Sequence, residues 1–196
     1  YQLWSFPGNP TSTSPVNLIV DDMPDAAFDN TKWRAFAYAG SGGWTEFEQL
    51  SSLNSGESYF ILIKDPGFSI NTGQTYTITT NQPYQINLTS GDWTFIGNPF
   101  DFSIPLSSVL TDDSTSISGD QNFYTYDGGS WTNASSLEPW GGYIYKSSSA
   151  STISIDPGAG SGGLLGRNAA APEIFLEDDE WLINIAARNG LGRDKF

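Results

Sequence analysis

Three short patterns occur twice along the chain in the same order, and this duplication constrains the fold more than any other feature. WSFPGNP at residues 4–10 returns as WTFIGNP at residues 93–99. FAYAGSGGW at residues 36–44 is matched by YTYDGGSW at 124–131, and LNSGESY at 53–59 by LEPWGGY at 137–143. The spacing drifts between the copies, as happens when turns gain or lose residues. The sequence therefore predicts two copies of one structural unit.

The repeated patterns are typical of strands and turns. An aromatic-x-Tyr segment followed by glycines and a Trp predicts a β-hairpin, because Gly supplies positive φ and the aromatic residues pair across the strands. The Gly-Asn-Pro segments predict equivalent turns held by the side chains of Asn9 and Asn98. Polar and apolar residues alternate at 75–80 and 84–89, which predicts two paired, half-buried strands joined around residues 81–83.

We therefore expect an all-β fold with two tandem antiparallel β-sandwich or barrel-like repeats and a C-terminal β-hairpin. The expected divisions are a first repeat with its linking hairpin (1–90), a second repeat (91–156), a Gly/Ala/Pro-rich linker (157–172) and a last segment (173–196). The last segment is either a strand pair, at 173–176 and 181–186, or the start of a truncated third domain.

Composition excludes several kinds of chemistry. The chain has no Cys and no His, so it can build no disulfide, zinc finger, Ser-His-Asp triad or His-ligated metal site. Its net charge of −14 disfavours binding to nucleic acid or anionic lipid. No apolar run is long enough for membrane insertion. A chain that opens on Tyr1 is expected to be a processed form or an internal fragment.

The order of these Trp, Gly-Asn-Pro, Tyr-x-Tyr and Pro-Trp-Gly-Gly-Tyr motifs resembles repeat regions of large secreted surface proteins of the Bacteroidetes. EWLINIAA at residues 180–187 is similar to the region that such proteins carry ahead of a type IX secretion sorting domain. The resemblance covers most of the chain. It implies an extracellular or cell-surface location and a modular β-architecture more than it implies an activity.

No catalytic pattern stands out. A formal G-x-G-x-x-G at residues 158–163 lacks the helix that a dinucleotide site requires, so a linker is the better interpretation. A glycosidase would need paired carboxylates, for which the candidates are Glu46, Glu48, Glu57 and Glu138. These residues lie on exposed strand or turn positions, so we expect solvated charges and no enzyme.

Two acidic clusters occupy matching positions of the two copies and are candidates for Ca²⁺, which prefers hard oxygen ligands. The spacing fits no EF-hand, and acidic surface loops are the alternative interpretation. The candidate ligands are Asp21, Asp22 and Asp25 in the first copy and Asp112, Asp113 and Asp120 in the second. Apart from Ca²⁺, no cofactor is expected.

Aromatic side chains are candidates for stacking on sugar rings. The candidate glycan-binding residues are Trp44, Trp131, Trp140 and Tyr145, together with Tyr126. A duplicated core would also repeat its aromatic residues, and on that ground Trp4, Trp93, Phe95, Tyr59 and Tyr143 are expected to be buried. Trp140 is the best candidate for a ligand contact, because the first copy has Gly56 at that position.

Two further sites are expected from local pattern. Asp113-Ser114-Thr115 resembles the O-glycosylation motif of exported Bacteroidetes proteins, so Ser114 is a candidate acceptor. The apolar strand that contains Trp181, Ile183 and Ile185 would be an exposed edge if unpaired. It either belongs to a missing domain or completes a sheet in a neighbouring molecule.

The leading functional hypothesis is a non-enzymatic extracellular β-module that serves as a spacer, an adhesive unit or a subunit of a surface fibre. The alternative is a carbohydrate-binding module attached to a polysaccharide-degrading enzyme. The expected partners are other surface proteins, glycans or copies of the chain itself.

Overall fold

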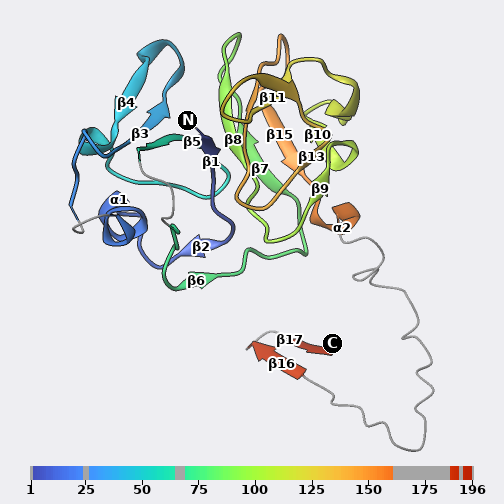
Figure 1. The fold of residues 1–196 in the computed structure, drawn as a ribbon. Coiled ribbons are helices and arrows are strands. Elements are labelled where there is room, and N and C mark those ends of the chain that lie inside the picture. Colours follow the sequence, from blue (N-terminus) through green and yellow to red (C-terminus); the bar gives the residue numbers. More distant parts are fainter. Residues whose placement is uncertain (1, 24–26, 65–68, 161–185, 190–191, 196) are drawn as a thin grey trace, which may run out of the picture. The chain divides into compact units, whose positions relative to one another are not determined.

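The strands form several antiparallel sheets and helix is almost absent, which confirms the all-β class (Figure 1). The computed structural model describes residues 2–23, 27–64, 69–160, 186–189 and 192–195. The chain divides into two units, Tyr1–Leu165 and Gly166–Phe196. Both copies of the sequence repeat lie in the first unit.

The first copy builds a four-stranded antiparallel sheet with the order β1-β5-β3-β4. The predicted hairpin is confirmed, because β3 pairs with β4 and places Tyr38 opposite Trp44. Short helical turns follow the strands. The bounds are β1 (Gln2–Trp4), β3 (Trp33–Tyr38), β4 (Trp44–Glu46), β5 (Tyr59–Ile63), α1 (Pro15–Leu18), η1 (Val20–Asp22), η3 (Gly40–Gly42) and η4 (Phe47–Gln49).

The second copy builds a sheet with the order β8-β14-β11-β12, which is the connectivity of the first sheet. Its hairpin is also confirmed, with Tyr126 opposite Trp131. The bounds are β8 (Thr94–Gly97), β11 (Phe123–Tyr126), β12 (Trp131–Asn133), β14 (Gly142–Tyr145), η5 (Leu106–Ser108) and η6 (Ile117–Gly119).

Strand register corrects the match at the start of the two copies. Trp4 lies opposite Tyr59, whereas Ile96 lies opposite Tyr143. Since Tyr59 and Tyr143 correspond, Trp4 matches Ile96 and not Trp93. The prediction of equivalent turns at Asn9 and Asn98 is therefore wrong: Asn9 is exposed in β2, and Asn98 is fully buried.

Residues 75–89 do not form the predicted hairpin. β6 (Thr75–Tyr76) pairs with β2 (Asn9–Pro10) in the first copy, and β7 (Tyr84–Asn87) pairs with β15 (Thr152–Ile155) in the second. The alternation correctly predicts half-buried strands but does not determine which strands pair. Pairing depends on the core that each strand covers, and Ile86 is buried in the core of the second copy. The remaining strands are β9 (Ile104–Pro105), β10 (Val109–Thr111) and β13 (Ser136–Leu137).

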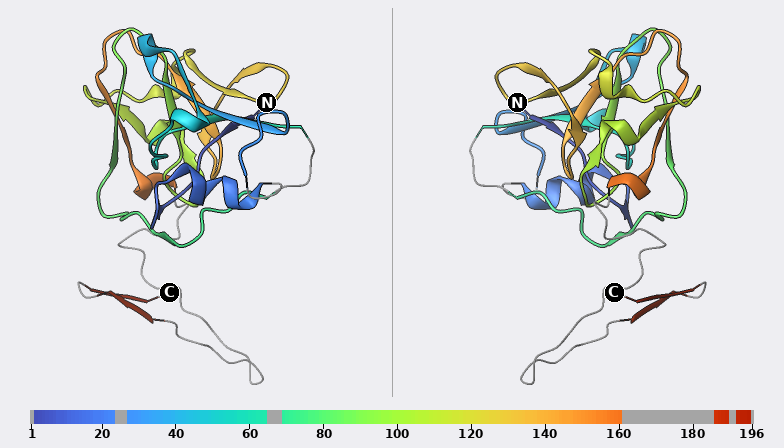
Figure 2. Two further views of the ribbon diagram at one scale, coloured as in Figure 1. Left: turned by 90° about the vertical axis from the view of Figure 1, so that its left-hand side faces the viewer. Right: turned by 90° about the vertical axis from the view of Figure 1, so that its right-hand side faces the viewer.

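Three hydrophobic cores organise the first unit. One lies within each copy, with Trp33 and Tyr59 buried in the first and Phe123 and Tyr143 in the second. The third, centred on Leu3, Phe95 and Ile144, joins residues of both four-stranded sheets. Figure 2 shows the blue to cyan segments of the first copy lying against the green to orange segments of the second.

Backbone hydrogen bonds cross between the copies in a reciprocal way. The Ser5 N–H donates to the Trp140 carbonyl at 3.1 Å, and the Gly97 N–H donates to the Gly56 carbonyl at 2.9 Å. By the corrected match Ser5 corresponds to Gly97, and by the repeat Gly56 corresponds to Trp140. Each copy therefore binds the turn of the other at the same place.

Three buried tyrosines make the fold sensitive to alkali. The Tyr59 hydroxyl accepts from the Asn54 N–H at 2.7 Å, and the Tyr143 hydroxyl accepts in the same way from the Glu138 N–H at 2.6 Å. Burial raises the pKa of Tyr59, and it raises the pKa of Tyr143 and of Tyr145 to about 12.

These pKa shifts predict that the free energy of unfolding falls as the pH rises from 10 towards 12. Unfolded tyrosine loses its proton at its ordinary pKa of 10.0, whereas the folded side chains keep theirs until about 12. Urea unfolding across this interval measures the effect, and Tyr145→Phe should make the decline shallower. A decline of the same slope in that variant would contradict the assignment to Tyr145.

In the second unit, the structure describes β16 (Ala186–Asn189) paired antiparallel with β17 (Gly192–Lys195). The predicted strands at 173–176 and up to residue 185, with Trp181, Ile183 and Ile185, lie outside the described residues. The predicted linker begins with the short α2 (Pro157–Gly160), and its residues 161–172 also lie outside. Among the described segments, no helix has the length and hydropathy to cross a membrane.

Candidate functional site

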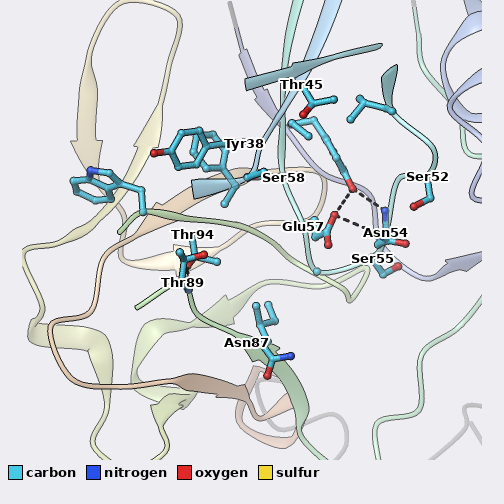
Figure 3. Close-up of a pocket in the computed structure, with 18 of the residues that line it drawn as sticks. Tyr38, Thr45, Ser52, Asn54, Ser55, Glu57, Ser58, Asn87, Thr89 and Thr94 are labelled. Carbon is cyan, nitrogen blue, oxygen red and sulfur yellow. Dashed lines mark hydrogen bonds between the residues drawn. The ribbon is translucent and has the colours of Figure 1, made fainter. Parts of the chain in front are cut away.

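A groove of about 690 Å³ lies where the segment before β5 meets β7 and β8 (Figure 3). Most side chains along it are neutral and able to donate and accept hydrogen bonds. Among the residues that line it, all of them described, there is no Lys or Arg and Glu57 is the single carboxylate. The neutral polar lining includes Thr45, Gln49, Ser52, Asn54, Gln85, Asn87 and Thr94.

Tyr38, Tyr84 and Trp93 contribute half-buried aromatic rings to the lining, so the expectation that Trp93 is buried in the core is wrong. The Tyr38 hydroxyl donates to the Asp92 carboxylate at 3.2 Å, and the Tyr84 hydroxyl donates to the Ser55 carbonyl at 2.8 Å. Trp93 packs edge-on against Tyr124, with ring centroids 5.9 Å apart. These contacts fix the rings before any ligand arrives.

Glu57 sits in a small hydrogen-bond network (Figure 3). Its Oε2 accepts from the Tyr59 hydroxyl at 2.7 Å and from Asn54 Nδ2 at 3.3 Å. Glycoside hydrolysis generally needs a second carboxyl group across the scissile bond. Among the residues that line the groove there is no second carboxyl group.

The other candidate carboxylates, Glu46, Glu48 and Glu138, do not line the groove. Glu46 forms a bidentate pair with Arg34 at 2.6 and 2.8 Å. Glu138 accepts from the hydroxyl groups of Ser103 and Ser136. These contacts hold loops and strands together.

A glycine shapes one wall of the groove. Gly56 has φ of +79°, and a Cβ added there would lie 2.6 Å from Tyr84 Cε1. Gly56 therefore lets the Tyr84 ring close over the turn. The matching turn of the second copy carries Trp140, also at positive φ, with a value of 64°.

Of the candidate glycan-binding aromatics, Trp44 and Trp131 lie together against Phe60, with ring centroids 5.5 and 6.0 Å from it. Trp44 and Trp131 are 51% and 43% exposed on β4 and β12. Trp44 contacts Phe95 edge-on at 5.3 Å and Trp131 contacts Phe60 at 6.0 Å, so both cover the core between the sheets. Trp140 lines a separate cavity of about 410 Å³.

Tyr145 and Tyr126 have structural contacts. Tyr145 is only 2% exposed and donates its hydroxyl to Asp120 at 3.0 Å, so it presents no face to a ligand. All four residues of β14 are buried, which explains this placement. Tyr126 packs against Trp131 at 5.1 Å.

The candidate calcium ligands are not brought together. Among the described residues, no three acidic side chains gather into a group that could hold a metal ion. Asp22 accepts from Asn71, and Asp120 accepts from the Asn122 N–H and the Tyr145 hydroxyl. Asp21 joins no such group, and Asp25 lies outside the described residues.

In the second copy, Asp112 and Asp113 hold turns. Asp112 accepts from the N–H and hydroxyl of Ser151, and these bonds hold the pKa of its carboxyl below the usual value. Hydrogen bonds from Thr111 and Thr115 lower the pKa of Asp113 in the same way. The carboxylates stabilise the loops that contain them.

Ser114 is exposed in the tight turn between Thr111 and Thr115, with φ of 64°. An exposed turn is compatible with a glycan, and modification of Ser114 stays a prediction.

The sequence predicts individual aromatic candidates but does not predict the groove. Its lining comes from residues 37–59 and 84–95, which meet through packing between the copies. The nearest sequence signal is the Asn- and Ser-rich stretch at 51–58. Compared with protein-family models, curated proteins and solved structures, the chain shows no match.

Proposed function

We propose that the chain is a non-enzymatic, extracellular adhesive β-module that binds a neutral glycan in the groove. The observation that carries the proposal is the lining of that groove: amide and hydroxyl side chains, five aromatic residues, one carboxylate and no Lys or Arg. The matching strand orders support the view that the module consists of two tandem, sandwich-like β-repeats that arose by duplication.

The lining matches the chemistry of a pyranose. Sugar hydroxyls both donate and accept, as do the side chains of Asn54, Gln85 and Asn87. The C–H face of a sugar ring packs on an aromatic face such as that of Trp93. The net charge of −14 disfavours acidic polysaccharides, so the ligand is a neutral one.

The proposed cell-surface location and adhesive role have separate support. Absence of Cys is compatible with a bacterial extracellular protein, and the resemblance to secreted Bacteroidetes repeat regions favours the cell surface. A ligand groove distinguishes an adhesive unit from a spacer or a passive fibre subunit.

Replacing Trp93 with alanine is expected to lower affinity for neutral polysaccharide about tenfold, as loss of a central aromatic contact usually does. Affinity electrophoresis on glucan, mannan, xylan and arabinan gels measures retardation. Val16→Ala is the control, since Val16 is exposed and does not line the groove. If the unmodified protein is retarded by none of these neutral polysaccharides, the glycan proposal is refuted and the spacer hypothesis is favoured.

A further inference from the structure

Trp140 adopts a backbone conformation that favours glycine. Its φ of 64° is matched by 79° at Gly56, the corresponding residue of the first copy. Both turns make the same backbone bond to the other copy, so glycine is sufficient for the turn. A bulky side chain in the left-handed region is strained, and such strain is often found at functional sites.

Packing accounts for only part of the Trp140 side chain. One face lies against Trp4, with ring centroids 6.3 Å apart and planes tilted by 34°. The side chain is still 38% exposed, and it forms one wall of the cavity of about 410 Å³. The strained position therefore places an aromatic ring at a cavity mouth.

A second aromatic ring lines the same cavity. Tyr76, on β6, is 62% exposed, the largest exposure among the large hydrophobic side chains of the described residues. Asp101 and Thr77 also line the cavity. Within the described part of the chain, the side chains of Tyr76, Thr77 and Asp101 form no hydrogen bond, and they are available to a ligand.

The cavity walls are held by bonds that do not depend on a ligand. Pairing of β2 with β6 fixes Tyr76 opposite Asn9. The Gly8 N–H donates to the Pro99 carbonyl at 2.8 Å, and Asn98 Nδ2 donates to the Leu137 carbonyl at 2.8 Å. The segments on either side of Asp101 and Trp140 are thus tied together, which limits the ordering cost of binding.

We propose that Trp140 and Tyr76 form a second sugar-binding site, in which the rings pack on a neutral pyranose and the Asp101 carboxylate accepts hydrogen bonds from its hydroxyl groups. This proposal rests on the proposed function and adds a second contact point for the same class of ligand. An anionic ligand would be repelled by Asp101, and a purely apolar one would leave that carboxylate desolvated. A cationic peptide is the competing ligand, since ammonium groups bind aromatic faces.

The test uses Trp140→Gly, which restores the residue that the first copy carries and suits the positive φ. Affinity for the neutral polysaccharide that retards the unmodified protein should fall about tenfold, while Val16→Ala, at an exposed position outside both cavities, binds normally. Tyr76→Ala, a change at an exposed strand position, should weaken binding in the same direction and serves if Trp140→Gly does not fold. In ¹H–¹⁵N spectra, the indole N–H signal of Trp140 should shift on addition of the matching oligosaccharide.

Each result has one meaning. If Trp93→Ala weakens binding and both Trp140→Gly and Tyr76→Ala bind normally, the second site is refuted and the proposed function stands. If the unmodified protein binds no neutral glycan, both proposals fail. A Trp140 signal that responds to oligolysine and not to oligosaccharide would replace the sugar with a cationic peptide.

Discussion

Asn98→Ala should lower the free energy of unfolding by about 3 kcal/mol, because leaving a buried polar group without its partner costs about 1–3 kcal/mol. Asn98 is fully buried. Its Nδ2 donates to the carbonyls of Phe102 and Leu137, both at 2.8 Å, and its Oδ1 accepts from the Phe100 N–H at 2.9 Å. Alanine would leave all three backbone groups without these partners.

Urea unfolding followed by tryptophan fluorescence measures this loss. Asn9→Ala is the matched control, since Asn9 is also followed by proline and is exposed. We expect a change of less than about 0.5 kcal/mol for the control, as is usual at surface positions. Equal effects of the two substitutions would contradict the structural role of Asn98.

Gly142→Ala should destabilise the chain by about 3 kcal/mol, the upper part of the range for overpacking a core. A Cβ on Gly142 would lie 2.7 Å from the carbonyl carbon and the Cβ of Leu3 and 2.8 Å from the Trp4 nitrogen. Backbone cannot move aside as a flexible side chain can, so β1 would have to shift away from the second copy. Leu3 belongs to the core between the sheets, which would open with it.

A matching substitution and a control sharpen this experiment. Gly97→Ala should be about as harmful, because its Cβ would lie 2.4 Å from the Glu57 carbonyl oxygen and 2.5 Å from Ser5 Cβ. Gly119→Ala should change little, since nothing lies within 4 Å of a Cβ there. If Gly142→Ala unfolds at the same urea concentration as Gly119→Ala, the tight contact between the copies is not present in solution.

Local features were predictable from the sequence. The two aromatic hairpins form as expected because the turn glycines and the pairing of Tyr38 with Trp44 and of Tyr126 with Trp131 lie within a few residues. The burial of Tyr145 could also have been predicted from the sequence. It lies two residues after Tyr143 on one strand and therefore on the same face, and Tyr143 was expected in the core.

Long-range features were not predictable. The WSFPGNP and WTFIGNP motifs suggested a register that pairing with Tyr59 and Tyr143 overrules. The alternation at 75–89 showed which residues face inward and carried no information about strand partners. The groove depends on the strand partners, because Tyr84 lines it from β7, which pairs with β15.

The reciprocal hydrogen bonds of Ser5 with Trp140 and of Gly97 with Gly56 form within one chain, so the contact between the copies does not depend on protein concentration. Two separate molecules joined in this way would come apart as their concentration falls. Here the same pairing occurs within one polypeptide, so each copy meets the other at an effective concentration set by the chain itself. A groove built from both copies therefore persists however dilute the protein becomes.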